Sequence, residues 1–233
     1  MELVRFADRP DVRALRSQLD EFPEFMTHNA VGSKYWGRLY DEFPAFQLAL
    51  LDGDRLVAEV HALSVPVDGD ELPVGWDDAF ERGMEAGGGN VLSLLAISVA
   101  GSRRGEGLAT TLIAAAREAA VAAGLESVIA AVRPTLKERY PLTPIEEFMT
   151  WRREDGAHLD PWIRRHERVG GRIERAAPRS MLIEASVADW ERWTQMVFPS
   201  DGTYVVPRML APLEIRAGIG VHVEPNVWLR HSV

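Results

Sequence analysis

The middle of the chain carries two apolar runs separated by a polar turn and an alanine-rich stretch. Val91–Val99 is an apolar run of strand length, and a Gly-Ser pair soon breaks it as turn residues do. From Thr110, leucine and alanine recur at helical spacing until Gly124, where a second apolar run leads to Val132. The pattern predicts a strand, a tight turn, a helix and a second strand, in that order.

The N-terminal half contains a hairpin signal. Phe46–Leu51 and Arg55–Val65 have strand character and flank Asp52-Gly53-Asp54, a typical turn sequence. Alternation along the second arm places Glu59 and His61 on one face. Two interpretations stay open: an exposed polar face on an otherwise buried sheet, or part of a reaction site.

Helix and strand signals continue after the second apolar run. Thr143 and Glu146 have the spacing of a capping box, which predicts a helix that begins with Thr143 as its cap. Asp160 followed by Pro161 predicts a second helix start, running to about Val169. Pro178 is expected to separate two short strands.

The turn Arg103-Arg104-Gly105-Glu106-Gly107-Leu108-Ala109 has the composition of an anion site. A helix N-terminus offers unpaired N–H groups and roughly half a positive charge, and small residues let ligand oxygens reach the backbone. A Walker-type phosphate loop needs a lysine after its glycines, and none follows here. The dinucleotide fingerprint needs a third glycine, but Thr110 stands at that position.

Arg104, Gly107 and Ala109 form R-x-x-G-x-A between the apolar strand and the alanine-rich helix. This arrangement resembles the coenzyme A pyrophosphate motif of the GNAT superfamily of N-acetyltransferases. The resemblance implies an α+β fold, the GNAT (acyl-CoA N-acyltransferase) fold, with a mixed central β-sheet flanked by helices. It implies acetyl-CoA as co-substrate and direct transfer of the acetyl group to a primary amine. The implied cofactor-binding residues are Ile97 and Val99 through their main chain, with Arg103, Arg104, Gly105, Gly107, Ala109 and Thr110 at the turn.

Catalytic candidates follow from the same resemblance. In the family, the strand that carries Glu59 and His61 lies close to the point of acyl transfer, so either residue is a candidate base. The family's late Tyr-x-x-x-Gly-Phe pattern places its tyrosine, which protonates the departing thiolate, at His166. An imidazolium can perform that task, although a surface histidine without a role fits equally well. Tyr140 is the second candidate acid.

Later segments extend the resemblance more loosely. From Val91 onward, and especially in RYPLTPIEEF, DPWIRRH and APRSM, the chain is similar to the acyltransferase-like domains joined to carbon–nitrogen hydrolases in some bacterial proteins. We expect one domain over residues 1–233, of which roughly residues 187–233 form a C-terminal extension and a candidate homodimer interface.

The composition limits the kinds of molecule that the protein is expected to bind. The net charge of −9 and the pI near 5.2 argue against nucleic-acid binding, which depends on neutralising phosphates, and favour an amine-bearing acceptor. We expect a small-molecule amine, while an antibiotic, an amino acid and a protein N-terminus all stay open. The absence of cysteine excludes disulfides and a cysteine nucleophile. The N-terminus lacks an apolar signal core and no apolar run reaches membrane-spanning length, so we expect a cytoplasmic protein without membrane contact. His222, Glu224 and His231 have no defined ligand geometry, so no metal is expected.

The sequence is compatible with two other functions. A coenzyme A-binding regulatory or partner module without turnover would explain the missing tyrosine. A nucleotide-dependent enzyme would use the same turn, and binding of NAD(P)H or ATP would reveal it.

Overall fold

A mixed β-sheet organises the protein. The computed structural model describes residues 1–19 and 22–233, and within them nine strands form one sheet in the order β1-β2-β3-β4-β5-β9-β8-β7, with β6 also paired to β9. All neighbouring strands are antiparallel except β4 and β5, which are parallel. The strands are β1 Glu2–Arg5, β2 Gln47–Asp52, β3 Arg55–Val65, β4 Val91–Val99, β5 Ser127–Val132, β6 Arg172–Ser186, β7 Gly202–Tyr204, β8 Leu213–Arg216 and β9 Ile219–Ser232.

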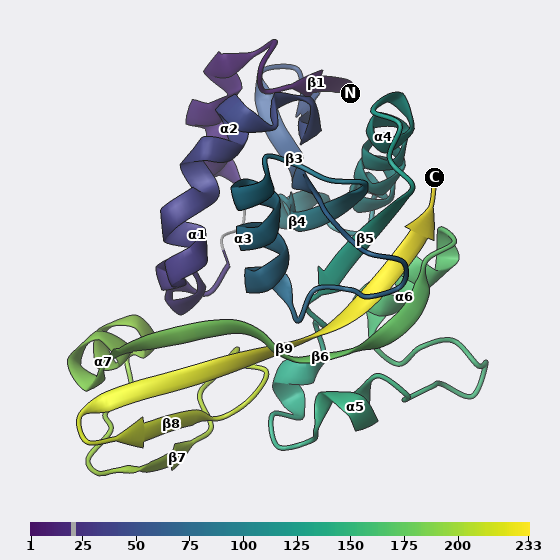
Figure 1. Ribbon diagram of the computed structural model, residues 1–233. Coiled ribbons are helices and arrows are strands. Elements are labelled where there is room, and N and C mark those ends of the chain that lie inside the picture. Colours follow the sequence, from purple (N-terminus) through teal and green to yellow (C-terminus); the bar gives the residue numbers. More distant parts are fainter. Residues whose placement is uncertain (20–21) are drawn as a thin grey trace.

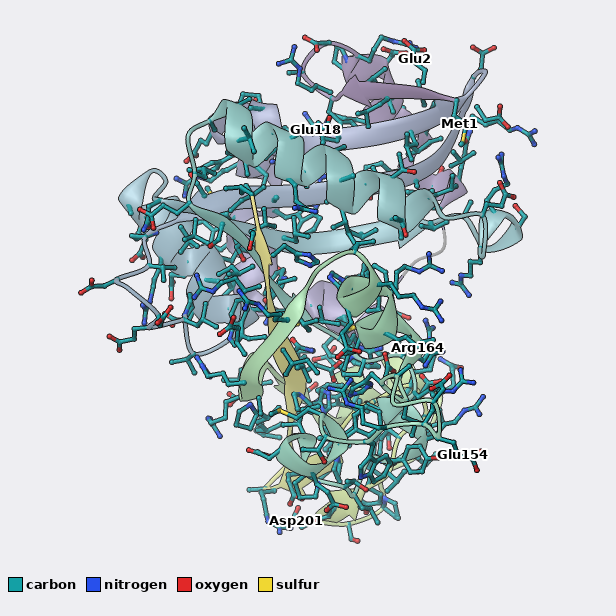
Figure 2. The ribbon with its side chains drawn as sticks, turned by 90° about the vertical axis from the view of Figure 1, so that its right-hand side faces the viewer. Met1, Glu2, Glu118, Glu154, Arg164 and Asp201 are labelled. Carbon is teal, nitrogen blue, oxygen red and sulfur yellow. The ribbon has the colours of Figure 1, made fainter. Side chains whose placement is uncertain are left out.

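Helices cover both faces of this sheet (Figures 1 and 2). The alanine-rich α4 packs on one face through Leu112, Ala116 and Ala120, whereas α3 packs on the other face and α1 packs against α3. The helices are α1 Ala30–Tyr35, α2 Leu39–Glu42, α3 Trp76–Ala86, α4 Leu108–Ala122, α5 Ile145–Phe148, α6 Pro161–Arg168 and α7 Val187–Thr194, with 3₁₀ segments at Pro10–Gln18, Glu24–His28, Trp36–Arg38, Pro44–Phe46, Gly101–Arg103 and Lys137–Arg139. Within the described residues, no helix has the length and apolar character needed to cross a membrane.

Most of the elements expected from the sequence are confirmed. The hairpin, the strand–turn–helix–strand unit and the mixed sheet flanked by helices are all present. Asp160 caps α6 as predicted, because its Oδ1 accepts from the backbone N–H groups of Trp162 and Ile163.

Two local expectations are wrong. Pro144, not Thr143, is the N-cap of α5, because extended backbone at Pro144 delays the helix to Ile145 and no side chain caps it. The strand β6 runs through Pro178 without a break. The ladder to β9 shifts its register between Ala177 and Met181, and such an irregularity accommodates a residue that lacks an N–H donor.

The parallel ladder between β4 and β5 is short. It joins Val91–Leu94 to Ser127–Ala130, whereas β4 continues beside β3 as far as Val99. Leu95 is an extra residue in β4, because β3 shifts register at this point, which is the geometry of a β-bulge. The two parallel strands therefore separate beyond Leu94. From there on, the edge of β4 that faces β5 has no strand partner among the described residues and faces the interior of the protein.

The long strands β6 and β9 reach away from the main sheet and carry a small C-terminal lobe (Figure 1). The lobe packs α7, β7 and β8 around the fully buried Trp190, whose Nε1 donates to the carbonyl of Gly220. The other end of β9 returns to the main sheet and pairs with β5. Residues beyond 187 thus contribute a central strand as well as the lobe.

Asp77 joins three elements on the helical face. Its Oδ1 accepts from Nδ2 of Asn29, the N-cap of α1, at 3.0 Å, and its Oδ2 accepts from the backbone N–H of Leu182 in β6 at 2.8 Å. Burial raises the pKa of Asp77 to about 6. The folded protein therefore binds this proton more tightly than the unfolded chain does.

The raised pKa predicts an unusual slope of stability with pH. Between about pH 4 and pH 6 the folded state holds the Asp77 proton and the unfolded state does not, so the contribution of Asp77 to stability should fall as pH rises through this window, by no more than about 3 kcal/mol. Asp77→Asn should remove this contribution, whereas Asp78→Asn, at the neighbouring carboxylate paired with Arg82, should retain it. Urea unfolding of the two variants between about pH 4 and pH 6 measures how stability depends on pH. A pH dependence in Asp77→Asn that equals that of the wild type would contradict the prediction.

Candidate active site

Two cavities meet where β4 and β5 separate. The first, which we call the turn cavity, has a volume of about 630 Å³ and includes the predicted anion-binding turn. The second, which we call the hairpin cavity, has a volume of about 720 Å³ and includes Glu59. The residues that line both are Phe22, Leu95, Ala96, Ser98, Ala131 and Arg133.

The turn cavity is open at the N-terminus of α4. Gly107 is the N-cap residue with φ +85°, and Gly105 has φ +90°, so both adopt the left-handed region that favours glycine. A Cβ added at either position would meet nothing within 4 Å, which leaves the backbone accessible from the cavity. This is the geometry in which helix N–H groups bind a phosphate.

Seven of the eight predicted cofactor-binding residues line the turn cavity. Thr110 does not; its hydroxyl accepts a hydrogen bond from Arg165 Nη1 at 3.1 Å, and Arg165 itself lines the cavity. The seven are Ile97, Val99, Arg103, Arg104, Gly105, Gly107 and Ala109.

Arg103 stabilises the turn through two ion pairs. Its Nη1 donates to Asp52 at 2.7 Å and its Nε donates to Glu106 at 2.8 Å. These two carboxylates offset its charge and connect the turn to the β2–β3 hairpin. Arg165, which approaches from α6, adds a further cation to the cavity wall.

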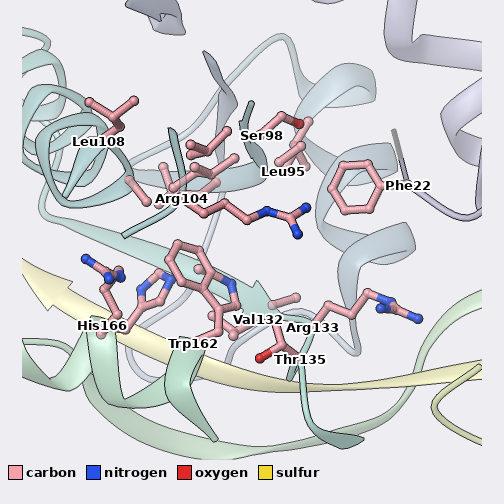
Figure 3. A pocket seen from close by; sticks show the side chains of 18 of the residues that line it. Phe22, Leu95, Ser98, Arg104, Leu108, Val132, Arg133, Thr135, Trp162 and His166 are labelled. Atoms are coloured by element: carbon pink, nitrogen blue, oxygen red, sulfur yellow. The ribbon is translucent and has the colours of Figure 1, made fainter. Parts of the chain in front are cut away.

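The opposite wall comes from α6. Trp162 and His166, one helical turn apart, lie across the cavity from Arg104 and Leu108 (Figure 3). Nδ1 of His166 lies 2.9 Å from Nε2 of His231 in β9. Burial lowers the pKa of His166 to about 3 and that of His231 to about 4. His166 is therefore neutral at neutral pH, and the imidazolium expected from the sequence is not available in the free protein.

Tyr140 lies elsewhere. Its ring packs edge-on against Trp151 and also contacts Phe148. Tyr140 is 39% exposed and lines neither the turn cavity nor the hairpin cavity. Its role as an acid stays a prediction without a contact to support it.

Glu59 lines the hairpin cavity, and His61 lies directly behind it. The two residues are 2% and 0% exposed, so the exposed-face interpretation is wrong. Arg16 forms a bidentate ion pair with Glu59, from Nη2 to Oε1 at 2.9 Å and from Nε to Oε2 at 3.0 Å. Burial alone would raise the pKa of Glu59, but the neighbouring His61 and the ion-paired Arg16 outweigh it and hold that pKa below the usual value. Burial lowers the pKa of His61.

The rest of the hairpin cavity combines aromatic and polar side chains. Trp36 and Trp76 supply aromatic surface, and Ser98 lies opposite Glu59 in the β3–β4 ladder. Arg133, at the junction of the two cavities, is held by an ion pair with the buried Glu224. The cavity thus offers a carboxylate, an arginine and aromatic faces to one small ligand.

The sequence did not reveal every lining residue. Arg16 pairs with Glu59 across 43 positions, and no local pattern reports such a contact. Trp162 and Arg165 had a usable signal, because both fall within one turn of His166 on a helix whose start was predicted. Among the described residues, no cluster of histidine and acidic side chains is arranged to hold a metal ion.

Comparison with known proteins indicates the family of this chain. A family model described as acetyltransferase (GNAT) family matches residues 14–142. The chain belongs to the GNAT family. It is 33% identical over 250 residues to arginine N-acetyltransferase avaD of Aspergillus versicolor, covering 91% of this chain and 85% of that protein. This GNAT protein is an N-acetyltransferase that takes its acyl group from a coenzyme A thioester.

Solved structures agree on the GNAT fold. The loading GNATL domain of CurA from Lyngbya majuscula superimposes with a TM-score of 0.65 at 18% identity, covering 99% of this chain and 96% of that one. The GphF GNAT-like decarboxylase in complex with isobutyryl-CoA gives a TM-score of 0.55, also at 18% identity, with 99% and 97% covered. At these identities the likeness extends to the fold alone.

The open space at Gly107 predicts the result of filling it. Gly107→Val should abolish acetyl-CoA binding, because the side chain would project into the turn cavity over the N-terminus of α4. Gly218→Val is the matched control. Gly218 has φ +81° and no atom within 4 Å of an added Cβ, as at Gly107, but it lies in the turn between β8 and β9, away from the turn cavity. Both variants carry the same backbone strain of about 1–2 kcal/mol, so calorimetric titration of the folded proteins isolates the effect on the site. Normal binding by Gly107→Val would contradict this assignment.

The two buried histidines predict acid sensitivity. The pKa values of His166 and His231 lie below the ordinary histidine value of about 6.5. Below about pH 6.5, the unfolded chain therefore binds protons at these two histidines while the folded protein keeps them neutral. The contribution of these two histidines to stability should therefore fall as pH drops from about 6.5 towards 4, opposite in sign to that of Asp77. His231→Gln should reduce this fall, measured as the pH dependence of the unfolding midpoint in urea; a slope as steep as that of the wild type would count against it.

Proposed function

We propose that the protein transfers the acetyl group of acetyl-CoA to the amine of a free amino acid, with arginine as the first acceptor to test. The observation that carries this proposal is the meeting of the two cavities where β4 and β5 separate. A donor in one cavity and an acceptor in the other would bring thioester and amine together at Ser98 and Ala131. Direct transfer needs little more than such positioning.

The turn cavity is the proposed donor site. The pyrophosphate binds the N–H groups from Arg104 to Ala109, with Arg165 as an added cation. The pantetheine arm lies along the open edge of β4, hydrogen-bonded near Ile97 and Val99. Thr110 acts indirectly by holding Arg165.

The hairpin cavity is the proposed acceptor site. Its chemistry suits an amino acid, because Arg133 can bind a carboxylate while Trp36 and Trp76 can face a cationic side chain. Arginine is favoured among amino acids because the relative from Aspergillus versicolor is named for it.

The proposed mechanism has one nucleophilic step. The acceptor's ammonium group gives up a proton to Glu59 or His61, and the neutral amine attacks the thioester carbonyl carbon. A backbone N–H near Val99 stabilises the developing oxyanion. As the C–N bond forms and the C–S bond breaks, the thiolate departs and receives the second proton of the amine nitrogen. Neutral His166 can still donate an N–H hydrogen bond on this path, whereas Tyr140 is less suited because it lines neither cavity.

We also propose that residues 1–233 act as one domain, since β9, from the stretch after residue 187, pairs with β5 beside the site. The net charge of −9 supports an enzyme that does not bind nucleic acid. A cytoplasmic location without membrane contact is also part of this proposal, and rests on the expectation from the N-terminal sequence and the lengths of the apolar runs. A homodimer through the C-terminal lobe remains part of this proposal.

Thiol release from acetyl-CoA tests the function. Arginine should be acetylated, and agmatine, which lacks the carboxylate, should react more slowly by about tenfold or more if Arg133 binds that group. Lysine and ornithine test the cationic side chain. Calorimetry with NADH and ATP is the control for the donor site. Tighter binding of a nucleotide than of acetyl-CoA, or binding of acetyl-CoA without transfer to any amine, would overturn the proposal.

A further inference from the structure

The side-chain amide of Gln47 has only one chemically sensible orientation. Gln47 lies in β2 and is fully buried. Its Nε2 lies 2.8 Å from the carbonyl oxygen of Phe43 and 2.7 Å from that of Ala62, and two carbonyls require a donor between them. The amide oxygen therefore faces Nδ1 of His61, 3.0 Å away.

This orientation fixes the tautomer of His61. An amide oxygen only accepts, so Nδ1 of His61 must carry the hydrogen. In the neutral ring, Nε2 is then an unprotonated acceptor. It lies 3.2 Å from Oε1 of Glu59 and has no hydrogen-bond partner among the residues that the structure describes. Two acceptors face each other at a distance that fits one proton between them.

Aromatic side chains enclose the imidazole of His61, which is fully buried. Phe6 stacks on the imidazole, and Trp36 and Tyr40 meet it edge-on. A proton that arrives between Glu59 and His61 would thus enter a buried position with aromatic rings on three sides.

The charged groups around the pair oppose permanent occupation of that position. Arg16 pairs with Glu59, and Arg13 lies over the ring of Tyr40, 3.9 Å from its centroid. Both arginines, together with burial, lower the pKa of His61, whereas Glu59 raises it. The resting protein therefore leaves the position vacant.

We propose that Gln47 is a positioning residue for the transfer reaction: it holds His61 as the Nδ1–H tautomer and so keeps a vacant proton site between His61 Nε2 and Glu59. The inference rests on the proposed function, because this site takes the proton that the acceptor's ammonium group must lose. Glu59 is the member of the pair that reaches the hairpin cavity, where it lies opposite Ser98 at the junction with the donor site.

The proton balance follows directly. The ammonium group passes one proton through the Glu59 carboxylate to Nε2 of His61, which becomes an imidazolium hydrogen-bonded to Glu59 and Gln47. The neutral amine then forms the C–N bond, and its second proton leaves with the thiolate as free thiol. The imidazolium returns its proton to solvent when the product departs. The sum is an ammonium ion and a thioester converted to an amide, a thiol and one proton.

Nitrogen NMR of the ¹⁵N-histidine-labelled wild-type protein tests the tautomer without any reaction. At about pH 8, the His61 signals, assigned by their loss in His61→Asn, should show a protonated Nδ1 and an unprotonated Nε2. An Nε2–H tautomer, or an imidazolium in the resting protein, would overturn the inference whatever the substrate proves to be.

Kinetics test the role in proton transfer. Gln47→Met should lower kcat/KM for arginine at about pH 7 by tenfold or more, with the KM for acetyl-CoA within about twofold. The deficit should shrink as pH rises towards about 9, because more of the arginine amine then arrives already neutral. Gln18→Met is the matched control, since Gln18 accepts from Leu56 N–H on the same strand β3 but does not contact His61.

A deficit in Gln47→Met that is equal at every pH would show a structural role only and would overturn the inference. If Gln47→Met does not fold, Glu59→Gln replaces it, because the new amide can donate a hydrogen bond to Nε2 of His61 and so fill the vacant proton site. The same pH-dependent deficit in kcat/KM is expected for Glu59→Gln. Absence of that deficit would contradict the inference. Failure of the wild type to acetylate any amine would instead refute the proposed function and leave the NMR result to stand alone.

Discussion

The separation of β4 from β5 is the constraint on which the rest of the structure depends. Their parallel ladder ends at Leu94 because Leu95 inserts as a bulge, and β4 then continues beside β3 alone. A strand edge without a partner must find other hydrogen bonds or face a solvent-filled space. Here one carbonyl, that of Leu95, accepts from Trp76 Nε1, and the remaining edge faces the two cavities. The opening is therefore created by backbone pairing, and side chains only line it.

The sequence predicted what depends on local pattern. The strand–turn–helix unit, the glycines at 105 and 107 and the cap at Asp160 were accessible because each depends on neighbours within a few positions. The family resemblance was accessible for the same reason, since its motif lies inside one turn.

Contacts between distant residues were not accessible. Sequence alternation placed Glu59 and His61 on one face, but whether that face is exposed depends on the 3₁₀ segment Pro10–Gln18 and on Phe6, which cover it. The burial of His166 has a similar origin, because β9 supplies His231 from 65 positions away. Composition cannot show that a histidine at the expected position will be neutral, since its pKa is set by whatever packs against it.

The pairing of β9 with β5 has a consequence for how the molecule folds. The partners Ser127 and Ser232 lie roughly a hundred residues apart, and such non-local pairing slows folding because the connecting chain must be ordered before the contact is made. The ion pair of Arg133 with Glu224 and the contact of His166 with His231 are also non-local, across 91 and 65 positions. An early folding species could contain the β2–β3 hairpin, β4 and α4, yet lack the wall formed by α6 and β9. We therefore expect the glycine-containing turn before α4 to form earlier than the cavity that it lines, so that completion of the cavity coincides with the last cooperative step of folding.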